Sequence, residues 1–469
     1  MSADYGVIGL AVMGQNLALN IESRGYTVAV YNRTRARTEE FVGQKGVGKK
    51  IIPTYSLSEF IASLAKPRKI ILMVKAGGPT DAVLEQLFPL LSARDIVLDG
   101  GNAHYSDTER RIELAKAYDI RYLGVGISGG EEGALHGPAI MAGGDQEGYE
   151  EVKEILTKIA GVGAEGACCA YFGPGSSGHY VKMVHNGIEY AIMETIAEAY
   201  DLMSRGLGMS AQEIADVFGE WNNGELSSYL FEISEVILRQ IDPETGNPLV
   251  EMILDEAAQK GTGKWSTQSA LDIGSPAPTI AMAVFARGLS ALKEERVRAH
   301  DILSGPDGEI TSDRLQFLGN LYEAVKITVL SAYAQGFRQL QDASRERGYN
   351  LDLAEVARVW MAGCIIRAKS LTQMGKAFRD DSKLPLLFLV DPFKAVWEEG
   401  QDRLRRIVGQ AHASGILLPA IDSAIDFVDG YRSSRLPANM IQAQRDFFGA
   451  HTYKRIDREG VFHTKWEER

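Results

Sequence analysis

The sequence has few cysteines, no long apolar run and no excess of positive charge. Its 469 residues include only three cysteines, Cys168, Cys169 and Cys364. Two of these are sequence neighbours, which rarely bridge each other, and no CxxC motif occurs, so we expect a reducing compartment. The longest apolar runs are far too short to span a bilayer. The segment MSADYGVIGL lacks the basic start of a signal peptide, and we therefore predict a cytoplasmic protein.

Acidic residues outnumber basic ones by 62 to 50, which gives a formal net charge of −12. The basic residues are scattered, which argues against nucleic acid or an anionic membrane as a partner. An acidic protein that binds a small anion has to gather lysine and arginine locally, so such a gathering would be a functional signal. We see no clustered carboxylates and no His/Cys spacing typical of a metal site, and we expect no metal.

Residues 1–175 alternate short β-rich runs with longer helical or turn segments. This alternation predicts a parallel sheet with crossover helices, that is, a Rossmann-like α/β domain. Two further runs, AIMAGG and ACCAYFG, are candidates for additional strands. The main β-rich runs are YGVIGL, TVAVYN, KIILMV, DIVLDGG and RYLGVGIS.

The first predicted strand leads into a glycine-rich turn, and the helical segment QNLALNIESRG follows. The turn has the pattern G-x-A-x-x-G, with alanine where the dinucleotide-binding fingerprint usually has its second glycine. Its place between a strand and a helix predicts that it binds the pyrophosphate of a dinucleotide. A glycine-rich turn without a ligand is the alternative. The turn consists of Gly9, Leu10, Ala11, Val12, Met13 and Gly14.

The end of the second strand indicates which dinucleotide is bound. An NAD site would place an Asp or Glu here to hold the ribose 2′-hydroxyl. This sequence has Asn32, Arg33 and Thr34 instead, with Arg35 and Arg37 behind them. A guanidinium suits a 2′-phosphate, and hydroxyl and amide donors complete its surroundings. We therefore predict NADP as the cofactor; a solvated basic turn is the alternative.

Three further strand ends carry candidate ligand-binding segments. In an open sheet, ligands gather at the carboxyl edge, where these segments fall. The last segment offers backbone N–H donors and a hydroxyl suited to a carboxylate, although alone it is equally compatible with a plain turn. The segments are Val74-Lys75-Ala76, Gly101-Asn102 and Ser128-Gly129-Gly130. We expect Val74, Lys75, Ala76 and Asn102 to contact the cofactor.

From about residue 176 the hydrophobic period changes to 3.6 and keeps that value for roughly 250 residues. We therefore predict a large all-α domain over residues 176–434, followed by a C-terminal tail over 435–469. The helical region also contains a faint internal repeat. Residues 196–224 resemble residues 333–363, with IADVF aligned to VARVW after a short insertion.

The segment GHYVKMVHNGIEY places Lys182, His185, Asn186 and Glu189 at helical spacings that stack them on one face. Next to a nicotinamide, Lys182 could take the proton from a substrate hydroxyl, provided that its pKa is lowered. Asn186 could hold the same hydroxyl and His185 a neighbouring one. Glu189 could deliver a proton elsewhere on the substrate, provided that its pKa is raised.

The alternative for this stripe is a solvated Lys–Glu helix face. In the register of the repeat, Lys182 aligns with Gly319 and Glu189 aligns with Lys326. The stripe therefore belongs to the first copy only. A stripe needed merely to build the repeat should recur in both copies, so this asymmetry favours catalysis.

These motifs resemble those of the 6-phosphogluconate dehydrogenases, an NADP-dependent decarboxylating family among the β-hydroxyacid dehydrogenases. The resemblance covers essentially the whole chain, and the alanine in the glycine-rich turn is itself typical of the family. The first and fourth motifs occur more widely in the superfamily, whereas the last three are specific. The motifs are GLAVMGQNLALN, YNRT, GISGGEEGA, GHYVKMVHNGIEY, DEAAQKGTGKW, AVFARGLSALKEER and RDFFGAHTYKRIDREGVFHTKW.

The resemblance implies a function, a homodimer and a role for each site residue. The function is oxidation and decarboxylation of 6-phosphogluconate to ribulose 5-phosphate, in the pentose phosphate pathway or gluconate utilization. Lys182 would be the base and Glu189 the acid. The sugar-acid end would be held by Asn102, Ser128, Gly129, Gly130, His185 and Asn186. The phosphate would be held by Tyr190, Lys260, Thr262 and Arg287, with Arg445 and His451 from the tail of the partner subunit.

Two other functions remain as alternatives. A β-hydroxyacid dehydrogenase that does not decarboxylate would share the fingerprint and the lysine motif, but it would have no use for Arg287, Arg445 and His451. A noncatalytic NADPH-binding scaffold would have no need of Lys182.

Overall fold

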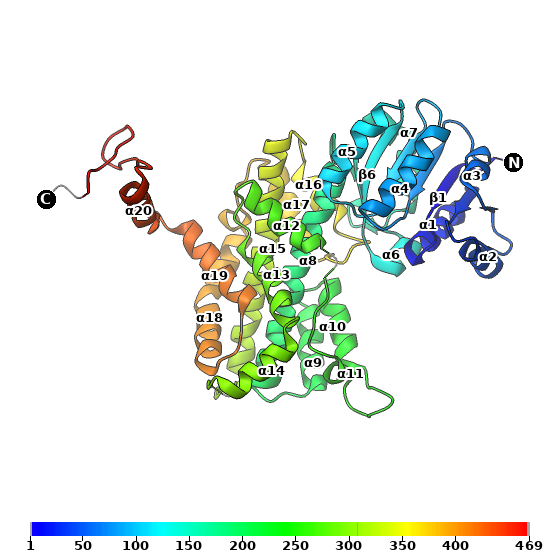
Figure 1. The fold of residues 1–469 in the computed structure, drawn as a ribbon. Coiled ribbons are helices and arrows are strands. Elements are labelled where there is room, and N and C mark those ends of the chain that lie inside the picture. Colours follow the sequence, from blue (N-terminus) through cyan, green and yellow to red (C-terminus); the bar gives the residue numbers. More distant parts are fainter. Residues whose placement is uncertain (1, 260, 307, 467–469) are drawn as a thin grey trace. The chain divides into compact units, whose positions relative to one another are not determined.

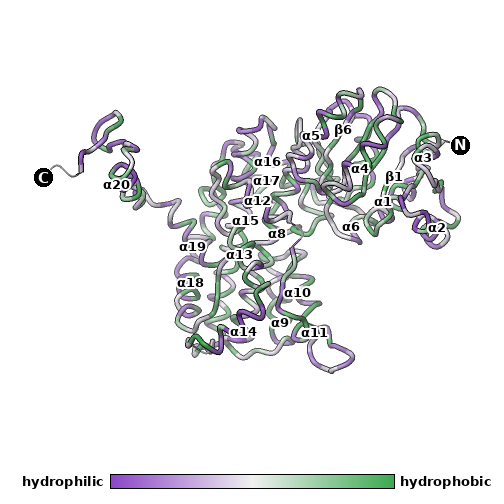
Figure 2. Tube along the Cα trace, viewed as in Figure 1, coloured by the Kyte–Doolittle hydropathy of each residue, from purple (hydrophilic) through white to green (hydrophobic). Residues whose placement is uncertain are grey.

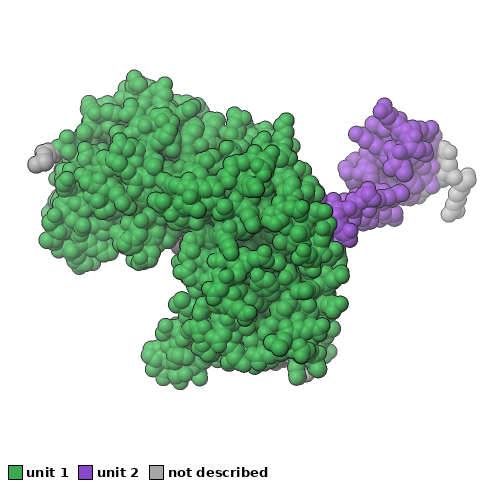
Figure 3. Space-filling view, turned by 180° about the vertical axis from the view of Figure 1, so that it is seen from behind, with its two compact units in different colours: residues 1–424 green, residues 425–469 purple. Residues whose placement is uncertain are grey.

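The computed structural model describes residues 2–259, 261–306 and 308–466. The chain forms two compact units, Met1–Ala424 and Ile425–Arg469 (Figure 3). The first unit contains both an α/β part and a helical part, so the domain limits predicted at residues 175 and 434 stay predictions.

The α/β part is built on one eight-stranded sheet (Figure 1). Its strands are β1 (Tyr5–Ile8), β2 (Val28–Tyr31), β3 (Ile51–Thr54), β4 (Lys69–Leu72), β5 (Ile96–Asp99), β6 (Arg121–Ile127), β7 (Ile140–Gly144) and β10 (Cys169–Tyr171). Their order is β10-β7-β6-β5-β4-β1-β2-β3, and all neighbours are parallel except β6 and β7. A separate hairpin pairs β8 (Val162–Gly163) with β9 (Gly166–Ala167).

The predicted β-rich runs are confirmed as β1, β2, β4, β5 and β6, and the two candidates as β7 and β10. Two details differ from the prediction. Strand β3 was not predicted because Pro53 interrupts its short apolar run, and β3 lies at the sheet edge, where proline is tolerated. The pairing of β6 with β7 is antiparallel, whereas the alternating pattern predicts parallel neighbours.

Helices cover both faces of the sheet. Ile71 of β4 belongs to one apolar core, and its neighbours Ile70 and Leu72 belong to the other, because successive strand residues point to opposite faces. Helices α1, α2 and α7 supply the first core, and α3, α4 and α5 supply the second. The helices of this part are α1 (Val12–Ser23), α2 (Arg35–Gln44), α3 (Leu57–Ala62), α4 (Gly78–Leu87), η1 (Phe88–Leu90), α5 (Tyr105–Lys116), α6 (Gly130–His136) and α7 (Gln146–Ile159).

The helical part begins at Ser177, in agreement with the change of the hydrophobic period at about residue 176. Across the described residues between 176 and 434, isolated bridges are the only β pairing. The elements are α8 (Ser177–Asp201), η2 (Leu202–Gly206), α9 (Ala211–Asn222), α10 (Tyr229–Arg239), α11 (Leu249–Met252), α12 (Thr262–Asp272), α13 (Pro278–Ser290), α14 (Lys293–Ile302), α15 (Arg314–Arg347), α16 (Leu353–Val359), α17 (Leu371–Asp380), η3 (Leu387–Leu389), α18 (Phe393–Ser414) and α19 (Pro419–Arg432).

The internal repeat corresponds to two long helices that are each followed by a shorter one. In the first copy α8 precedes α9, and in the second copy α15 precedes α16. Helix α15 packs against both α8 and α18. Hydrophilic residues dominate α2 and α14 (Figure 2). Within the described residues, no helix has the length and apolar character needed to cross a membrane.

The second unit contains the end of α19, the helix α20 (Ala438–Gly449) and a short irregular segment. Tyr453 and Phe462 form an antiparallel bridge that turns this segment back on itself.

Candidate active site

Helix α8 lies directly on the sheet because four glycines remove side chains from the contact. A Cβ on Gly126 of β6 would overlap the side chain of Lys182, and a Cβ on Gly124 would lie 2.8 Å from Nδ1 of His179. Gly143 of β7 and Gly178 of α8 face backbone atoms of the other element in the same way. This close approach places Lys182 at the carboxyl end of β6.

The Lys182 ammonium group is buried and has polar but uncharged hydrogen-bond partners. Its Nζ donates to Oγ of Ser128 at 3.0 Å and lies 3.1 Å from Nδ1 of His185. Across the part of the chain that the structure describes, no carboxylate lies within ion-pair distance of Nζ. Ser128 Oγ also lies 3.2 Å from Nε2 of His185. The three side chains therefore form one compact hydrogen-bonded cluster.

Burial sets the protonation states in this cluster. It lowers the pKa of Lys182 to about 8, and the nearby Glu189 opposes this shift only in part. Burial, followed by the charge of Lys182, holds the pKa of His185 well below its usual value, so the imidazole is neutral. Burial raises the pKa of Glu189, against the opposing effects of Lys182 and Arg287. A base near neutrality and a carboxyl group that can hold a proton thus lie on one helix.

The rest of the stripe continues along α8 towards α12. The Asn186 carbonyl oxygen lies 3.0 Å from Nδ1 of His185, and its amide donates to Oγ1 of Thr262 at 2.9 Å. Glu189 Oε2 lies 3.7 Å from the same His185 nitrogen. Helix α8 contacts β6 and β7 of the sheet on one side and the helices α12, α13 and α15 on others. The predicted stripe residues are therefore brought together on one face, together with Thr262 from another helix.

The segment after β6 forms a turn that brings backbone groups close to α8. Gly129 and Gly130 adopt the left-handed conformation, with φ of 110° and 62°. A Cβ on Gly129 would lie 2.6 Å from the Gly363 carbonyl oxygen, so no other residue fits there. The turn begins at Ser128, which already contacts Lys182.

The segment after β5 leaves a buried polar atom without a partner. Asn102 has a left-handed backbone with φ of 51°, and its Oδ1 has no hydrogen-bond partner among the described residues. A buried oxygen of this kind is costly unless a ligand satisfies it. Because Asn102 lies at the carboxyl edge of the sheet, this atom marks a place for a bound donor group.

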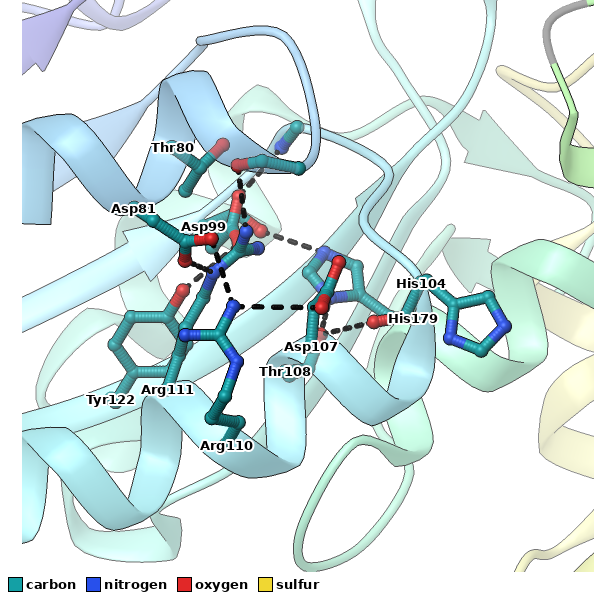
Figure 4. Close-up of polar contacts among 12 residues, drawn as sticks. Thr80, Asp81, Asp99, His104, Asp107, Thr108, Arg110, Arg111, Tyr122 and His179 are labelled. Atoms are coloured by element: carbon teal, nitrogen blue, oxygen red, sulfur yellow. Dashed lines mark hydrogen bonds and ion pairs between the residues drawn. The ribbon is translucent and has the colours of Figure 1, made fainter.

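A buried ion-pair network holds the strand ends behind the site (Figure 4). The fully buried Arg111 of α5 donates to Oδ1 of Asp81 at 2.8 Å and to Oδ2 of Asp99 at 3.1 Å. It also donates to the Gly77 carbonyl at 3.0 Å. The Tyr122 hydroxyl donates to the same Asp99 oxygen at 2.9 Å. One guanidinium thus joins the loop after β4 to the end of β5.

The same network reaches the beginning of α8 (Figure 4). Nε2 of His179 donates to the Asp99 backbone carbonyl at 2.9 Å, and its Nδ1 lies 2.7 Å from Oγ1 of Thr108. Burial lowers the pKa of His179, so its ring is neutral and Nδ1 accepts from the Thr108 hydroxyl. His179 lies one turn before Lys182, and its two hydrogen bonds therefore fix the rotation of α8 about its axis.

A cavity of about 410 Å³ joins the segments that the sequence predicts to bind a dinucleotide. Gly9 has φ of 99°, and a Cβ there would lie 2.5 Å from the Met73 carbonyl oxygen. The Asn32 side chain accepts from the Leu10 N–H at 3.1 Å, which joins the glycine-rich turn to the end of β2. The cavity is lined by Ile8, Gly9, Ala11, Tyr31, Asn32, Arg33, Thr34, Arg37, Met73, Val74, Lys75, Pro79 and Val83.

The lining of this cavity fits a nucleotide that carries a 2′-phosphate. Among its described residues there are three cations, Arg33, Arg37 and Lys75, and no carboxylate. Arg35 points elsewhere, because it forms an ion pair with Glu39 at 2.7 Å. The other predicted cofactor residues, Val12, Met13, Gly14 and Ala76, lie in α1 or next to the cavity-lining segments.

The residues predicted to bind a phosphate lie in different parts of the structure. The Arg287 guanidinium of α13 lies 3.5 Å from the ring centroid of Tyr190 on α8. Lys260 lies outside the described residues. Arg445 and His451 lie in the second unit, on α20 and just after it. The described residues contain no group of three or more His, Cys, Asp or Glu side chains that could hold a metal ion.

Sequence reasoning did not identify His179, Asp99, Arg111 or the packing glycines as parts of the site. Gly124 and Gly126 stand in a β-rich run where glycine is unusual, and that was a readable signal of close backbone approach. Arg111 gave no such signal, because a lone arginine in a helix usually faces solvent.

Comparison with known proteins gives a consistent result over the whole chain. The family description "NAD binding domain of 6-phosphogluconate dehydrogenase" matches residues 4–173, and "6-phosphogluconate dehydrogenase, C-terminal domain" matches residues 178–466. The decarboxylating 6-phosphogluconate dehydrogenase of Escherichia coli K12 is 52% identical over 462 residues, which is 98% of each chain.

Two further relatives extend this similarity. The NADP(+)-dependent, decarboxylating 6-phosphogluconate dehydrogenase of Bacillus subtilis is 51% identical over 462 residues, again 98% of each chain. The solved structure of Plasmodium falciparum 6-phosphogluconate dehydrogenase matches with a TM-score of 0.95 and 44% identity, over 99% of this chain and 100% of that one. A chain with this fold, this lysine cluster and these relatives belongs to the 6-phosphogluconate dehydrogenase family.

Proposed function

We propose that the protein converts 6-phosphogluconate to ribulose 5-phosphate and carbon dioxide, with NADP as the cofactor, in the cytoplasmic pentose phosphate pathway. The observation that carries this proposal is the buried Lys182, whose pKa of about 8 suits a general base. Membership of the family supports the choice of substrate and cofactor.

NADP is proposed to occupy the cavity beside the glycine-rich turn. The N-terminus of α1 would take the pyrophosphate, since its free N–H groups attract an anion. Arg33, Asn32 and Thr34 would take the 2′-phosphate, and Lys75 adds a further cation to the same lining. The bound cofactor supplies a hydride acceptor. The chain itself supplies the groups that move protons.

Lys182 removes the proton from the 3-hydroxyl group of the substrate as that carbon is oxidised. The amine has to be neutral for this step, and burial makes the neutral form accessible near pH 8. The product is a β-keto acid, and Lys182 now carries the proton. As an ammonium group it donates to the new carbonyl oxygen and polarises it, while Ser128 Oγ stays within hydrogen-bond distance of Nζ.

Loss of carbon dioxide follows from this polarisation. The bond between C1 and C2 breaks, its electron pair moves towards the polarised carbonyl, and an enediol remains. During this step the proton of the Lys182 ammonium group passes to the former carbonyl oxygen. Glu189 then gives its proton to the carbon that lost the carboxylate, and the neutral Lys182 takes back the proton from the enediol oxygen, which completes ribulose 5-phosphate. Its raised pKa allows the carboxyl group to hold that proton beforehand.

The substrate phosphate is proposed to bind between α8, α12 and α13, at Tyr190, Lys260, Thr262 and Arg287. In the homodimer that we propose, Arg445 and His451 of the partner subunit's tail complete this site. Large exposed apolar side chains on both units support an interface, because aromatic residues and methionine are enriched at interfaces. These side chains are Phe285, Leu289, Val297 and Ile302 in the first unit, and Met440, Ile441, Phe447 and Phe448 in the second.

An assay of both half-reactions tests the proposed function. Purified protein is mixed with NADP and 6-phosphogluconate, and NADPH absorbance and released carbon dioxide are followed together. We expect one carbon dioxide for each NADPH. NADPH without carbon dioxide would instead indicate a β-hydroxyacid dehydrogenase that does not decarboxylate, and neither product would contradict the proposal altogether.

A mixed dimer tests whether the tail acts on the partner subunit. One chain carries Lys182→Ala, and the other carries Arg445→Ala with His451→Ala. At a substrate concentration near the parental KM, each alone is expected to show almost no activity, the first because it lacks the proposed base and the second because it binds the substrate weakly. If tails act on the partner, one of the two sites in the mixed dimer joins an intact Lys182 to an intact tail, and activity returns. If tails act on their own chain, every site contains a lesion and the mixture stays inactive. We expect activity to return.

A further inference from the structure

Asp446 is the one buried residue of α20, and it is a carboxylate. Its Oδ1 accepts from the Thr452 N–H and from Nδ1 of His463, both at 2.9 Å. Its Oδ2 accepts from the Thr464 N–H at 3.0 Å and from Nε1 of Trp466 at 2.9 Å. Burial alone would raise the pKa of Asp446, but these hydrogen bonds outweigh it and bring the pKa to about 2. One charged carboxylate thus binds four donors of the C-terminal segment, which lie between Thr452 and Trp466.

The segment that Asp446 holds is conformationally strained on both sides of His451. Ala450 and Thr452 have φ of 49° and 60°, which is unfavourable for residues with a Cβ. Such a conformation persists only where its surroundings enforce it. Here Asp446 binds the N–H of Thr452, and Nε2 of Gln442 donates to the Thr452 carbonyl at 2.6 Å. Both anchors come from α20.

The same helix carries Arg445, the neighbour of Asp446. Arg445 Nη1 donates to Oε1 of Gln442 at 3.3 Å, so one glutamine contacts both Arg445 and the segment after His451. The His451 ring packs over Gly449, where a Cβ would lie 2.7 Å from Nε2, and its centroid lies 5.9 Å from that of Phe448. Arg445 and His451 are both exposed. Two groups that can bind an anion, Arg445 and His451, are therefore held on α20 and the residues directly after it.

We propose that Asp446 is a positioning residue that holds Arg445 and His451 as one preformed clamp for the substrate phosphate. This inference rests on the proposed role of those two residues in phosphate binding. Asp446 is buried and acts through them. A preformed clamp loses less conformational freedom on binding than two independent side chains, so it binds the phosphate more tightly. The benefit should therefore appear in substrate affinity rather than in the chemical step.

Asp446→Asn tests the proposal in the full-length enzyme. The amide keeps the size of the side chain but turns an N–H group towards two of the four donors. We expect the KM for 6-phosphogluconate to rise about ten-fold or more, with the KM for NADP and kcat within about two-fold of the parent. Competitive inhibition by inorganic phosphate should weaken in parallel. Asp457→Asn is the matched control, since it makes the same charge change at an exposed position that pairs with Arg455; its KM should not change.

A double-mutant cycle separates positioning from a general role in folding the tail. In a chain that already carries Arg445→Ala and His451→Ala, Asp446→Asn should raise the KM no further. A further rise in that background, or a loss of kcat together with dissociation of the dimer, would overturn the proposal. If the Arg445→Ala, His451→Ala chain itself keeps the parental KM, the phosphate role fails and the inference fails with it. If that chain loses affinity but Asp446→Asn does not, only the positioning role fails.

Trp466→Phe provides a second test in case Asp446→Asn does not fold. It removes one donor to Oδ2 and keeps an aromatic ring at the contact with Phe447. We expect a KM rise of about three-fold, in line with the loss of one of four hydrogen bonds. A KM equal to that of the parent enzyme would overturn the proposal.

Discussion

The two long helices of the repeat, α8 and α15, each carry a lysine, buried on α8 and partly buried on α15, and the two lysines have opposite surroundings. On α8, Lys182 contacts Ser128 and His185, and burial lowers its pKa to about 8. On α15, Nζ of Lys326 lies 2.9 Å from Glu225 and 3.0 Å from Glu323. Burial alone would lower the pKa of Lys326, but these carboxylates outweigh it and raise the pKa.

The two lysines thus differ in environment and not in residue type, and this difference supports a structural role for Lys326 and the proposed catalytic role for Lys182. The partly buried Lys326, with two carboxylate partners, stays charged and stabilises the helix packing. A buried lysine without one is held near its neutral form, which costs stability and creates a base. The lowered pKa of Lys182 is what its proposed role as a base requires.

Removing each lysine is the most severe test of this contrast. Lys182→Met should lower kcat by about 10³-fold or more, because it deletes the general base. NADP binding, measured by fluorescence titration, should be retained. Lys326→Met is the matched control and should keep kcat within about two-fold. Near-normal turnover by Lys182→Met would mean that the stripe on α8 is structural.

Giving Lys182 a carboxylate partner should make it resemble Lys326, whose pKa is raised by its carboxylate partners. Ser128→Asp places a carboxylate next to Nζ, which raises the pKa of Lys182 and keeps it protonated. We expect kcat/KM at pH 7.5 to fall about 100-fold, and to fall about ten-fold further than in Ser128→Asn, which has the same size but no charge. Equal losses in the two variants would show that charge at this position does not control the base.

Glu189 on α8 aligns with Lys326 on α15 in the register of the repeat. Replacing Glu189 tests the second proton transfer. Glu189→Gln removes the acid but keeps the shape. We expect turnover to fall about 10- to 100-fold while Lys182 can still act, so NADPH and carbon dioxide should form in a first turnover faster than ribulose 5-phosphate. Rapid-quench product analysis measures this lag. Equal rates for all three products would contradict the assignment of Glu189 to the last step.

Thermal stability should move in opposite directions for the two lysines. The folded-state pKa of Lys182 is about 8 against an ordinary value of 10.5, so the unfolded chain binds more protons between these values. The cost of burying the ammonium group is therefore full below about pH 8 and disappears above about pH 10.5. At pH 7, Lys182→Met should raise Tm by about 2–4 °C, and Lys326→Met should lower it by about 1–2 °C. The gain for Lys182→Met should shrink as pH rises towards 10. A lower Tm for Lys182→Met at pH 7 would contradict this.

The sequence predicts those parts of the molecule that depend on local pattern. The strands are short β-rich runs, the glycine-rich turn follows the first of them, and the stripe on α8 is visible because a helix repeats every 3.6 residues. The edge strand β3 was missed because Pro53 hides its pattern, and the residues of β7 do not show that it runs antiparallel to β6. The edge position of β3 and the direction of β7 become visible only once the strands are paired in the sheet.

Contacts between distant segments could not be predicted from pattern. Ser128 lies 54 residues from Lys182, and nothing in either segment shows that their side chains meet. The same holds for His179 with Asp99, which joins α8 to β5, and for Arg111 with Asp81, which joins α5 to α4. Asp446 looks like an ordinary polar residue of α20 until its four donors are seen.

The pH dependence of kcat/KM for 6-phosphogluconate tests most directly whether Lys182 acts as a neutral base. Because the free enzyme has to lose a proton from Lys182 before it can accept one, kcat/KM should rise with pH and level off through a midpoint near 8. In Ser128→Asp the midpoint should shift upward, because the added carboxylate favours the ammonium form. A rate that does not change between pH 7 and 10, or a midpoint that stays in place in Ser128→Asp, would contradict the role of Lys182.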